Sequence, residues 1–216
     1  MTAICPSSIL ACGLRVTLLD SLGAVSTDPN NYWVSDKLVQ ITVSPDVEVG
    51  PDTTLRGGCN CIVATAKFPD LLKRFNFEIN LAAIEPGLLS MMTGASVVLE
   101  GTGDPIGLNW PTGIDCAASP PPNVALEVWS QAWDGDHQDT TLPYIHWVWP
   151  MTHWQIGQSV LSTDFFTPVL TGFSEGNPEW GLGPYGDDSG TAVGDNGGFW
   201  FTATEPPTAA CEYQTV

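Results

Sequence analysis

The chain has 216 residues, 43% of them apolar, and a formal net charge of −18. That length and apolar content suffice for a packed core, and nine Trp, eight Phe and four Tyr residues exclude an acidic disordered tail. All six Lys and Arg residues lie within the first 74 residues, whereas 17 Asp and Glu residues follow them. Direct binding of DNA or RNA through residues 75–216 is therefore strongly disfavoured, because such binding depends on cationic side chains. The same charge also favours solubility, which is the simpler explanation of the bias.

The N-terminal segment, residues 1–13, lacks a basic leader and is interrupted by Pro6. We therefore expect no signal peptide, and no apolar run approaches the roughly 18 to 20 residues of a membrane span. Without an export signal, the six cysteines are expected to be free thiols in a reducing cytoplasm. Cys59 and Cys61 would share one face of a strand, and a zinc site there would need two further ligands from elsewhere in the fold.

Residues 39–49 and 74–81 alternate between apolar and polar side chains, which predicts two strands that each have one buried face. The apolar side chains expected to face the core are Val39, Ile41, Val43, Phe75, Phe77 and Ile79. Gly50, Pro51 and Asp52 favour a turn at the tip of a long hairpin between these strands. Further strands are predicted at residues 14–19, 61–66, 97–100, 124–133, 144–151, 159–162, 169–173 and 199–204.

One segment, residues 86–94, favours a helix. Pro86 suits the first helical turn, and Gly94 suits the C-terminal stop. So short a helix is not stable alone, so we expect Leu88, Leu89 and Met92 to pack on a sheet. The fold class is therefore mainly β, an antiparallel β-sandwich or partly closed barrel with one short α-helix, in a single domain over residues 1–216.

Three segments complete this organisation. Residues 115–123, which include the SPPPN connection, and residues 186–198 are expected to form flexible loops. Residues 205–216 are expected either to fray or to form a C-terminal arm that docks on a neighbouring subunit. Trp33 is expected in the core, with an inter-subunit contact as the alternative.

The chain carries no recognisable catalytic pattern. His137, His146 and His153 have no metal-ligand spacing, and no nucleophile, Walker or dinucleotide-binding motif occurs. Asp134, Asp136 and Asp139 resemble a calcium loop, but the spacing and closing Glu of an EF-hand are missing, so a solvated hairpin tip is the alternative. We therefore predict no enzyme activity, no catalytic, cofactor-binding or metal-binding residue, and no cofactor.

Three stretches together resemble the major tail proteins, or tail tube proteins, of siphoviruses that infect actinobacteria, including the mycobacteriophage type. They are LKRFNFEINLAAIEPGLLSMMTG at residues 72–94, NVALEVWSQAW at 123–133 and GNPEWGLGPY at 176–185. Each motif alone is weak, but the three occur in the family's order. The polyproline segment at 120–122 and the stretch at 186–198 have no counterpart.

The resemblance implies a structural virion protein without an enzyme site. Subunits would form hexameric rings in which their sheets join into one β-barrel, and the rings would stack into a tail tube that carries double-stranded DNA during ejection without binding it specifically. The implied partners are further copies of the chain and other tail proteins such as the tape measure, terminator and tip proteins, with no membrane. The implied location is the virion tail, assembled in the host cytoplasm.

If the chain forms a tail tube, the polar faces of the strands at residues 39–49 and 74–81 are expected to line the channel. The connection between these strands is expected to reach the next ring. The lumen-facing residues would be Gln40, Thr42, Ser44, Asp46, Glu48, Asn76, Glu78 and Asn80. The ring-stacking loop would include Asp46, Glu48, Pro51, Asp52 and Arg56, with Arg56 and Lys37 meeting carboxylates of a neighbour. We expect Arg15, Lys67 and Arg74 to lie away from the bore, because basic side chains that lined the bore would bind the phosphates of the DNA.

The sequence is also compatible with two alternative functions. The first is a Trp-rich acidic β-sandwich that binds carbohydrate, free or as a virion decoration, with Trp147, Trp149 and Trp154 as stacking platforms. Against it, Ile145, Trp147, Trp149 and Met151 form one continuous apolar face, as in a core or an interface. The second is an acidic glycosidase, which would need two carboxylates to converge in a cleft.

Overall fold

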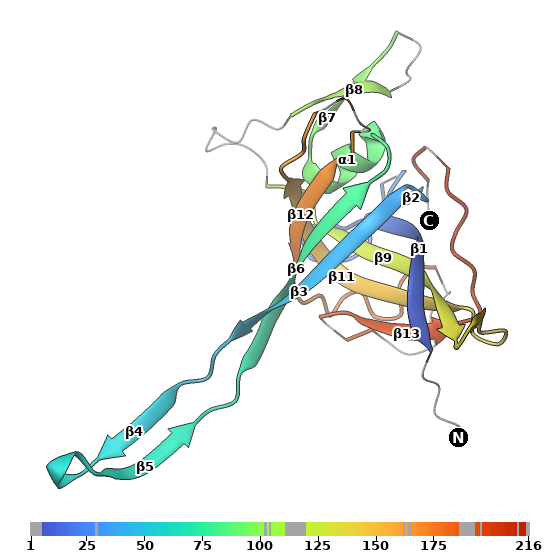
Figure 1. Cartoon of the computed structure of the whole chain (residues 1–216). Helices are drawn as coiled ribbons and strands as arrows, with labels where there is room; N and C mark the ends of the chain where they lie inside the picture. The colour runs from blue at the N-terminus through green and yellow to red at the C-terminus, as the bar shows by residue number, and fades with distance from the viewer. Residues whose placement is uncertain are drawn as a thin grey trace.

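The structure, a computed structural model, describes residues 6–28, 30–101, 103, 105–110, 120–161, 163, 166–185, 193–194, 196–210 and 212–214. Most strands belong to one antiparallel sheet (Figure 1). Its order is β2 (Tyr32–Ser35), β1 (Ser7–Leu18), β9 (Val124–Asp134), β11 (Tyr144–Ile156), β12 (Val169–Ser174), β6 (Leu71–Leu81) and β3 (Leu38–Glu48). β10 (His137–Gln138) pairs with β9, and β13 (Gly198–Thr202) pairs with β11.

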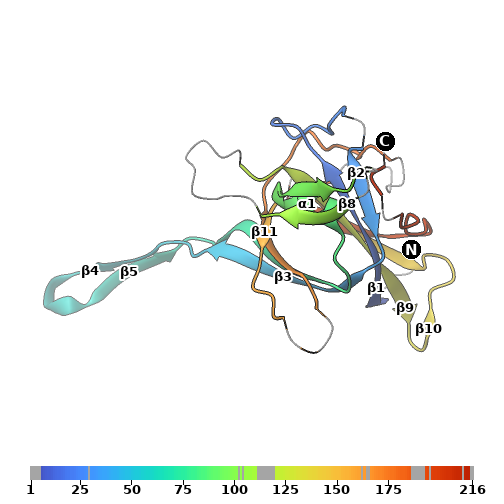
Figure 2. The same ribbon diagram turned by 90° about the horizontal axis from the view of Figure 1, so that it is seen from above.

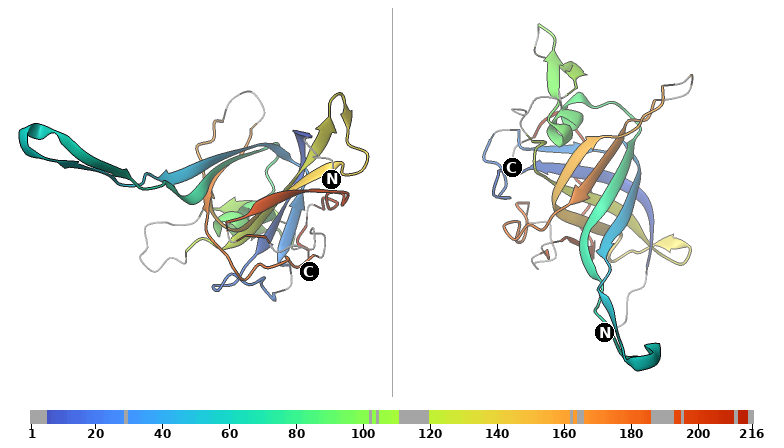
Figure 3. Two further views of the ribbon diagram at one scale, coloured as in Figure 1. Left: turned by 90° about the horizontal axis from the view of Figure 1, so that it is seen from below. Right: turned by 90° about the vertical axis from the view of Figure 1, so that its left-hand side faces the viewer.

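Two hairpins stand outside this sheet. One pairs β4 (Asp52–Arg56) with β5 (Ile62–Lys67) around the short 3-10 turn η1 (Gly58–Asn60), and the other pairs β7 (Ser96–Leu99) with β8 (Pro105–Asn109). Figures 1 and 3 place these hairpins at opposite ends of the subunit.

The main sheet curls strongly, and β3 comes into contact with β1 (Figure 3, right). No ladder joins these two strands within the described ranges, so the curl is not a closed barrel. The mainly β, antiparallel class is confirmed, and α1 (Pro86–Thr93) is the only α-helix in the part of the chain that the structure describes.

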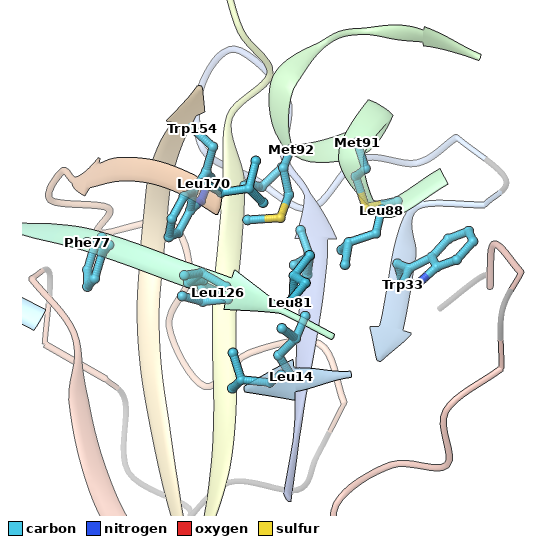
Figure 4. Packing of buried hydrophobic residues seen from close by; sticks show 14 of the residues in the cluster. Leu14, Trp33, Phe77, Leu81, Leu88, Met91, Met92, Leu126, Trp154 and Leu170 are labelled. Atoms are coloured by element: carbon cyan, nitrogen blue, oxygen red, sulfur yellow. The ribbon is translucent and has the colours of Figure 1, made fainter. Parts of the chain in front are cut away.

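The larger core fills the inside of the curl (Figure 4), and α1 lies across one end of the curl (Figure 2). Pro86 begins the helix, and Gly94 ends it with a left-handed φ of 72° and an N–H that donates to the Ser90 carbonyl at 2.8 Å. Leu88, Leu89 and Met92 are all buried in the core. The helix therefore closes one end of the apolar interior.

A smaller core lies on the opposite face of the sheet, where Leu19, Ala125 and Val148 pack against Trp180. Strands β9 and β11 are consequently buried on both faces. This explains why the residues of β11 show little apolar-polar alternation.

Most predicted strands coincide with observed ones, but several expectations are wrong. Residues 159–161 are not in a strand, and β2, β4, β8 and β10 were not predicted. Val39 does not face the core: the pairing of β3 with β6 shifts between Leu38 and Gln40, so Leu38 is buried and Val39 is 56% exposed. Val43 shares the face of Phe77 but is 38% exposed.

The end of the described chain packs on its own subunit. The ring of Tyr213 lies edge-on to Trp33 at 5.1 Å between centroids, and Gln214 forms a β-bridge with Tyr32. Trp33 itself is buried, as expected for a core residue. The loop expectations over 115–119, 186–192 and 195 and those for residues 211, 215 and 216 lie outside the described residues.

Candidate assembly surfaces

A two-stranded arm projects from the body, and we define it as residues 46–74 (Figures 1 and 2). It comprises the end of β3, the β4–β5 hairpin and the start of β6. Every residue of the arm is exposed except the half-buried Asp46 and the buried Gly50. The arm therefore makes almost no contact with the body of its own subunit.

The predicted hairpin tip is wrong by several residues. Gly50, Pro51 and Asp52 do not turn the chain; the tip is η1, where Cys59 and Asn60 adopt left-handed φ values of 58° and 62°. The Gly50–Pro51 step instead separates the β3–β6 ladder from the β4–β5 ladder, so one long hairpin has two paired sections. Cys59 and Cys61 lie at this tip and not along one strand face.

The break between the two ladders is stabilised by close packing of the backbone. The Gly50 N–H donates to Asp70 Oδ1 at 2.9 Å, and a Cβ at Gly50 would lie 2.1 Å from the Phe68 carbonyl oxygen. Phe68 N–H donates to the Pro51 carbonyl at 3.0 Å. Only glycine fits this position, so the direction of the distal arm depends on it.

The distal hairpin is amphipathic. The cross-strand register places Thr53 opposite Ala66 and Leu55 opposite Ala64, which gives one face of apolar and small side chains. The other face carries Asp52, Thr54, Thr65 and Lys67. Leu55 is 63% exposed, so the apolar face has no cover in the described subunit.

All five residues predicted for the ring-stacking loop lie on the arm, but three have partners within their own chain. Arg74 lies 3.0 Å from Asp46, and Lys73 lies 3.2 Å from Glu48, across the base of the arm. Arg56 donates to the carbonyl and side-chain oxygens of Asn60 at 3.4 and 3.2 Å. Lys37, outside the arm, lies 2.7 Å from Asp36. Such exposed pairs contribute only about 0–1 kcal/mol each to stability, so these side chains can exchange their intrachain partners for groups of a neighbouring chain.

The predicted lumen-facing residues form one polar surface, together with side chains that the sequence did not single out. Thr42 pairs with Glu78, which pairs with Thr171, which pairs with Gln155, so one rung crosses β3, β6, β12 and β11. The next rung comprises Ser44, Asn76, Phe173 and His153. Gln40 pairs with Asn80 on the side of the first rung that faces away from the arm. Asp46 and Glu48 follow Ser44 along β3 and lie on the arm. We call these two rungs with Gln40 and Asn80 the polar face.

Strand alternation separates the polar face from the core along β6. Phe77 and Ile79 are buried, whereas Asn76 and Glu78, which alternate with them, are exposed. Arg74 does not point away from this side of the sheet, since its guanidinium lies 4.8 Å from the Phe173 ring centroid. It is nevertheless paired with Asp46, which offsets its charge.

A buried charged cluster that no sequence pattern indicated lies on the smaller-core side of the sheet. Arg15 donates from Nε and Nη2 to the two oxygens of Glu127 at 2.7 and 2.8 Å, and His146 Nε2 lies 3.1 Å from Glu127 Oε1. Burial alone would raise the pKa of Glu127, but the hydrogen bond with His146 and the charge of Arg15 outweigh it, and the pKa is lowered. Arg15 and Glu127 face each other across β1 and β9, a pairing that the sequence cannot reveal.

The motif at residues 176–185 covers this cluster. Tyr185 lies over the Arg15 guanidinium, with 3.3 Å from Cζ to the ring centroid, and its hydroxyl shares a 2.6 Å hydrogen bond with Thr17. Burial raises the pKa of Tyr185, so its hydroxyl stays protonated. Asn177 anchors the segment by donating to the carbonyls of Gly23 and Pro150 at 2.8 and 3.1 Å. This motif therefore acts as a structural cover of the sheet.

The Trp residues of the carbohydrate-binding alternative and the acidic residues of the calcium alternative do not form exposed binding sites. Trp149 and Trp154 are buried, and the half-buried Trp147 donates from Nε1 to Ser130 at 2.9 Å, so they do not form a carbohydrate platform. Asp139 accepts from the Thr141 and Leu142 N–H groups in a turn, and these bonds lower its pKa. Within the described ranges, no three His, Cys, Asp or Glu side chains gather as a metal site, and no helix is long and apolar enough to cross a bilayer.

No model of a known protein family matches the chain, and a search of curated proteins finds no match.

Proposed function

We propose that the chain is a structural virion protein whose copies form stacked hexameric rings, the tail tube of a siphovirus, through which the genome passes. The observation that carries this proposal is the arm. It places Val49, Leu55, Ile62, Val63 and Phe68 in solvent, each more than half exposed. Uncovered apolar side chains on a thin two-stranded extension favour burial against another chain.

The main sheet offers a second contact. Along β3, one backbone edge pairs with β6, and no strand pairs with the other edge within the described ranges. In a ring, the sheet of one copy can continue from this edge into the next copy, which removes the exposed edge and extends the polar face around a bore. Closure into a barrel thus belongs to the assembly and not to the subunit.

The charge distribution suits a channel for DNA. The arm contains four basic and four acidic residues and is net neutral, so the other residues carry the whole charge of −18. Six copies carry −108 in total. A bore lined by even part of this charge would repel phosphates and let DNA pass without binding.

The test is assembly with and without the distal arm. Because Pro51 and Phe68 are directly hydrogen-bonded, residues 52–67 can be replaced by an Asn-Gly turn that closes the shortened hairpin. The full chain should form hollow rings and tubes in negative-stain electron microscopy, and the shortened chain should stay folded by circular dichroism but form no tubes. A full chain that sediments as a monomer at all concentrations would contradict the proposal. A structure in which no contact between copies buries more than about 800 Å² would also contradict it.

A further inference from the structure

The body carries an apolar groove at the end opposite the arm. The groove, of about 670 Å³, lies between α1, the β7–β8 hairpin and the segments around β12. Ile84, Ile106, Trp110 and Leu161 line it and are between 57% and 83% exposed. No charged side chain is among the described residues that line it.

The groove cannot be filled by the arm of the same subunit. Figure 1 and the right panel of Figure 3 show α1 and β7–β8 at one end of the molecule and β4–β5 at the other. At about 3.3 Å per residue, the arm extends about 40 Å from residue 46 to residue 58. That length is close to the diameter of a body of this size, whose radius of gyration is about 17 Å.

Charge selects the arm as the occupant of the groove. Outside the arm, the chain carries 20 acidic and only two basic residues, so charge repulsion opposes the approach of a second body to the groove. The net-neutral arm brings an apolar hairpin face, centred on Leu55, without that repulsion. A face with no charged residue and a groove with none match each other, because neither leaves a buried charge unpaired.

We infer that the apolar face of the β4–β5 hairpin of one copy docks in the groove between α1 and β7–β8 of a second copy. This inference rests on the proposed function and names the partner surface of the arm. The two surfaces differ, so the contact is head-to-tail, and a head-to-tail contact whose rotation does not close into a ring repeats as an open stack.

The test uses the full chain with single charges placed on each surface. Leu55→Glu on the arm and Ile106→Glu in the groove should each reduce the pelleted tube fraction at least tenfold, while single rings remain visible. Thr54→Glu, on the opposite hairpin face, and Leu22→Glu, exposed outside the groove, are the matched controls and should stay within twofold of the wild type. A Leu55→Lys/Ile106→Glu double variant should recover tubes, because each contact then pairs opposite charges.

The outcomes separate this inference from the proposed function. If the wild type stacks but Ile106→Glu stacks equally well, the groove is not the arm's partner and the inference falls, while the tube proposal stands. If Ile106→Glu prevents the rings themselves, the groove belongs to lateral contacts, which also overturns the inference. A wild type that forms no rings or stacks overturns both.

Discussion

At the residue scale, Glu127 shows how one buried ion supports the fold. Glu127 is 2% exposed, and its carboxylate holds the guanidinium of Arg15 on the smaller-core side of the sheet. A buried pair adds little net stability compared with an apolar pair, but removal of one partner leaves the other charge unpaired. Arg15 and Glu127 therefore depend on each other more strongly than the exposed pairs at the base of the arm.

We expect Glu127→Gln to lower the free energy of unfolding by about 3–5 kcal/mol at pH 7, measured by urea denaturation, because Arg15 stays charged and buried. The folded pKa of Glu127 is lowered, so its contribution is present above the ordinary value of 4.5 and is lost as the pH falls through the folded pKa. The gap between wild type and variant should thus narrow below pH 4.5. Glu205→Gln, at an exposed acid, is the control. A gap that stays constant from pH 7 to pH 3 would show that the pair does not act through this ionisation.

At the element scale, the arm depends on the glycine that joins its two ladders. A methyl group at Gly50 would collide with the Phe68 carbonyl, whereas a Cβ at Gly58, in the tip of the same arm, meets nothing within 4 Å. These two positions form a matched pair of Gly→Ala substitutions in one hairpin.

We expect Gly50→Ala to displace the distal hairpin and to reduce tube formation at least fivefold, while the midpoint of thermal unfolding of the body changes by less than about 2 °C. The small thermal effect follows from the exposure of the arm, whose residues contribute little to the cores. Gly58→Ala should assemble as the wild type does. Equal assembly of both variants would mean that the direction of the arm has no role in stacking.

At the scale of the whole molecule, the polar face and the charge distribution together predict how the assembled bore treats DNA. Glu78 lies at the centre of this face, exposed between Phe77 and Ile79, which are buried. Replacement of Glu78 by Lys changes the charge by two per subunit without disturbing the core. We expect tubes of Glu78→Lys to retain double-stranded DNA at about 50 mM salt and to release it as salt increases, since the binding displaces counterions.

Wild-type tubes and tubes of Glu205→Lys, with the same change at an exposed acid outside the polar face, should retain no DNA in the same filter-binding assay. Equal retention by Glu78→Lys and Glu205→Lys tubes would place the polar face away from the bore. It would also leave the acidic composition with solubility as its explanation.

Much of the local structure was predictable, because it depends on neighbours in the sequence. The alternation along residues 74–81 correctly separates Phe77 and Ile79 from Asn76 and Glu78, and Pro86 and Gly94 correctly delimit the helix. The prediction that Val39 faces the core is wrong because a bulge shifts the register at one residue, and no local sequence pattern indicates this bulge. The predicted position of the hairpin tip is wrong because a Gly-Pro step can interrupt a β-ladder as readily as it can form a turn.

The sequence by itself determined the antiparallel, mainly β class, the single short α-helix and the confinement of basic residues to the first 74 positions, since periodicity, capping and composition are local or additive properties. Only the tertiary structure decided that Arg15 meets Glu127, that residues 176–185 cover them, and that the polar face extends across β12 and β11. It also decided that the arm lies at the opposite end of the subunit from α1 and the β7–β8 hairpin, whose residues line the apolar groove. These features join residues up to 170 positions apart, and pairing between distant strands is set by the packing of the whole core and not by any single segment.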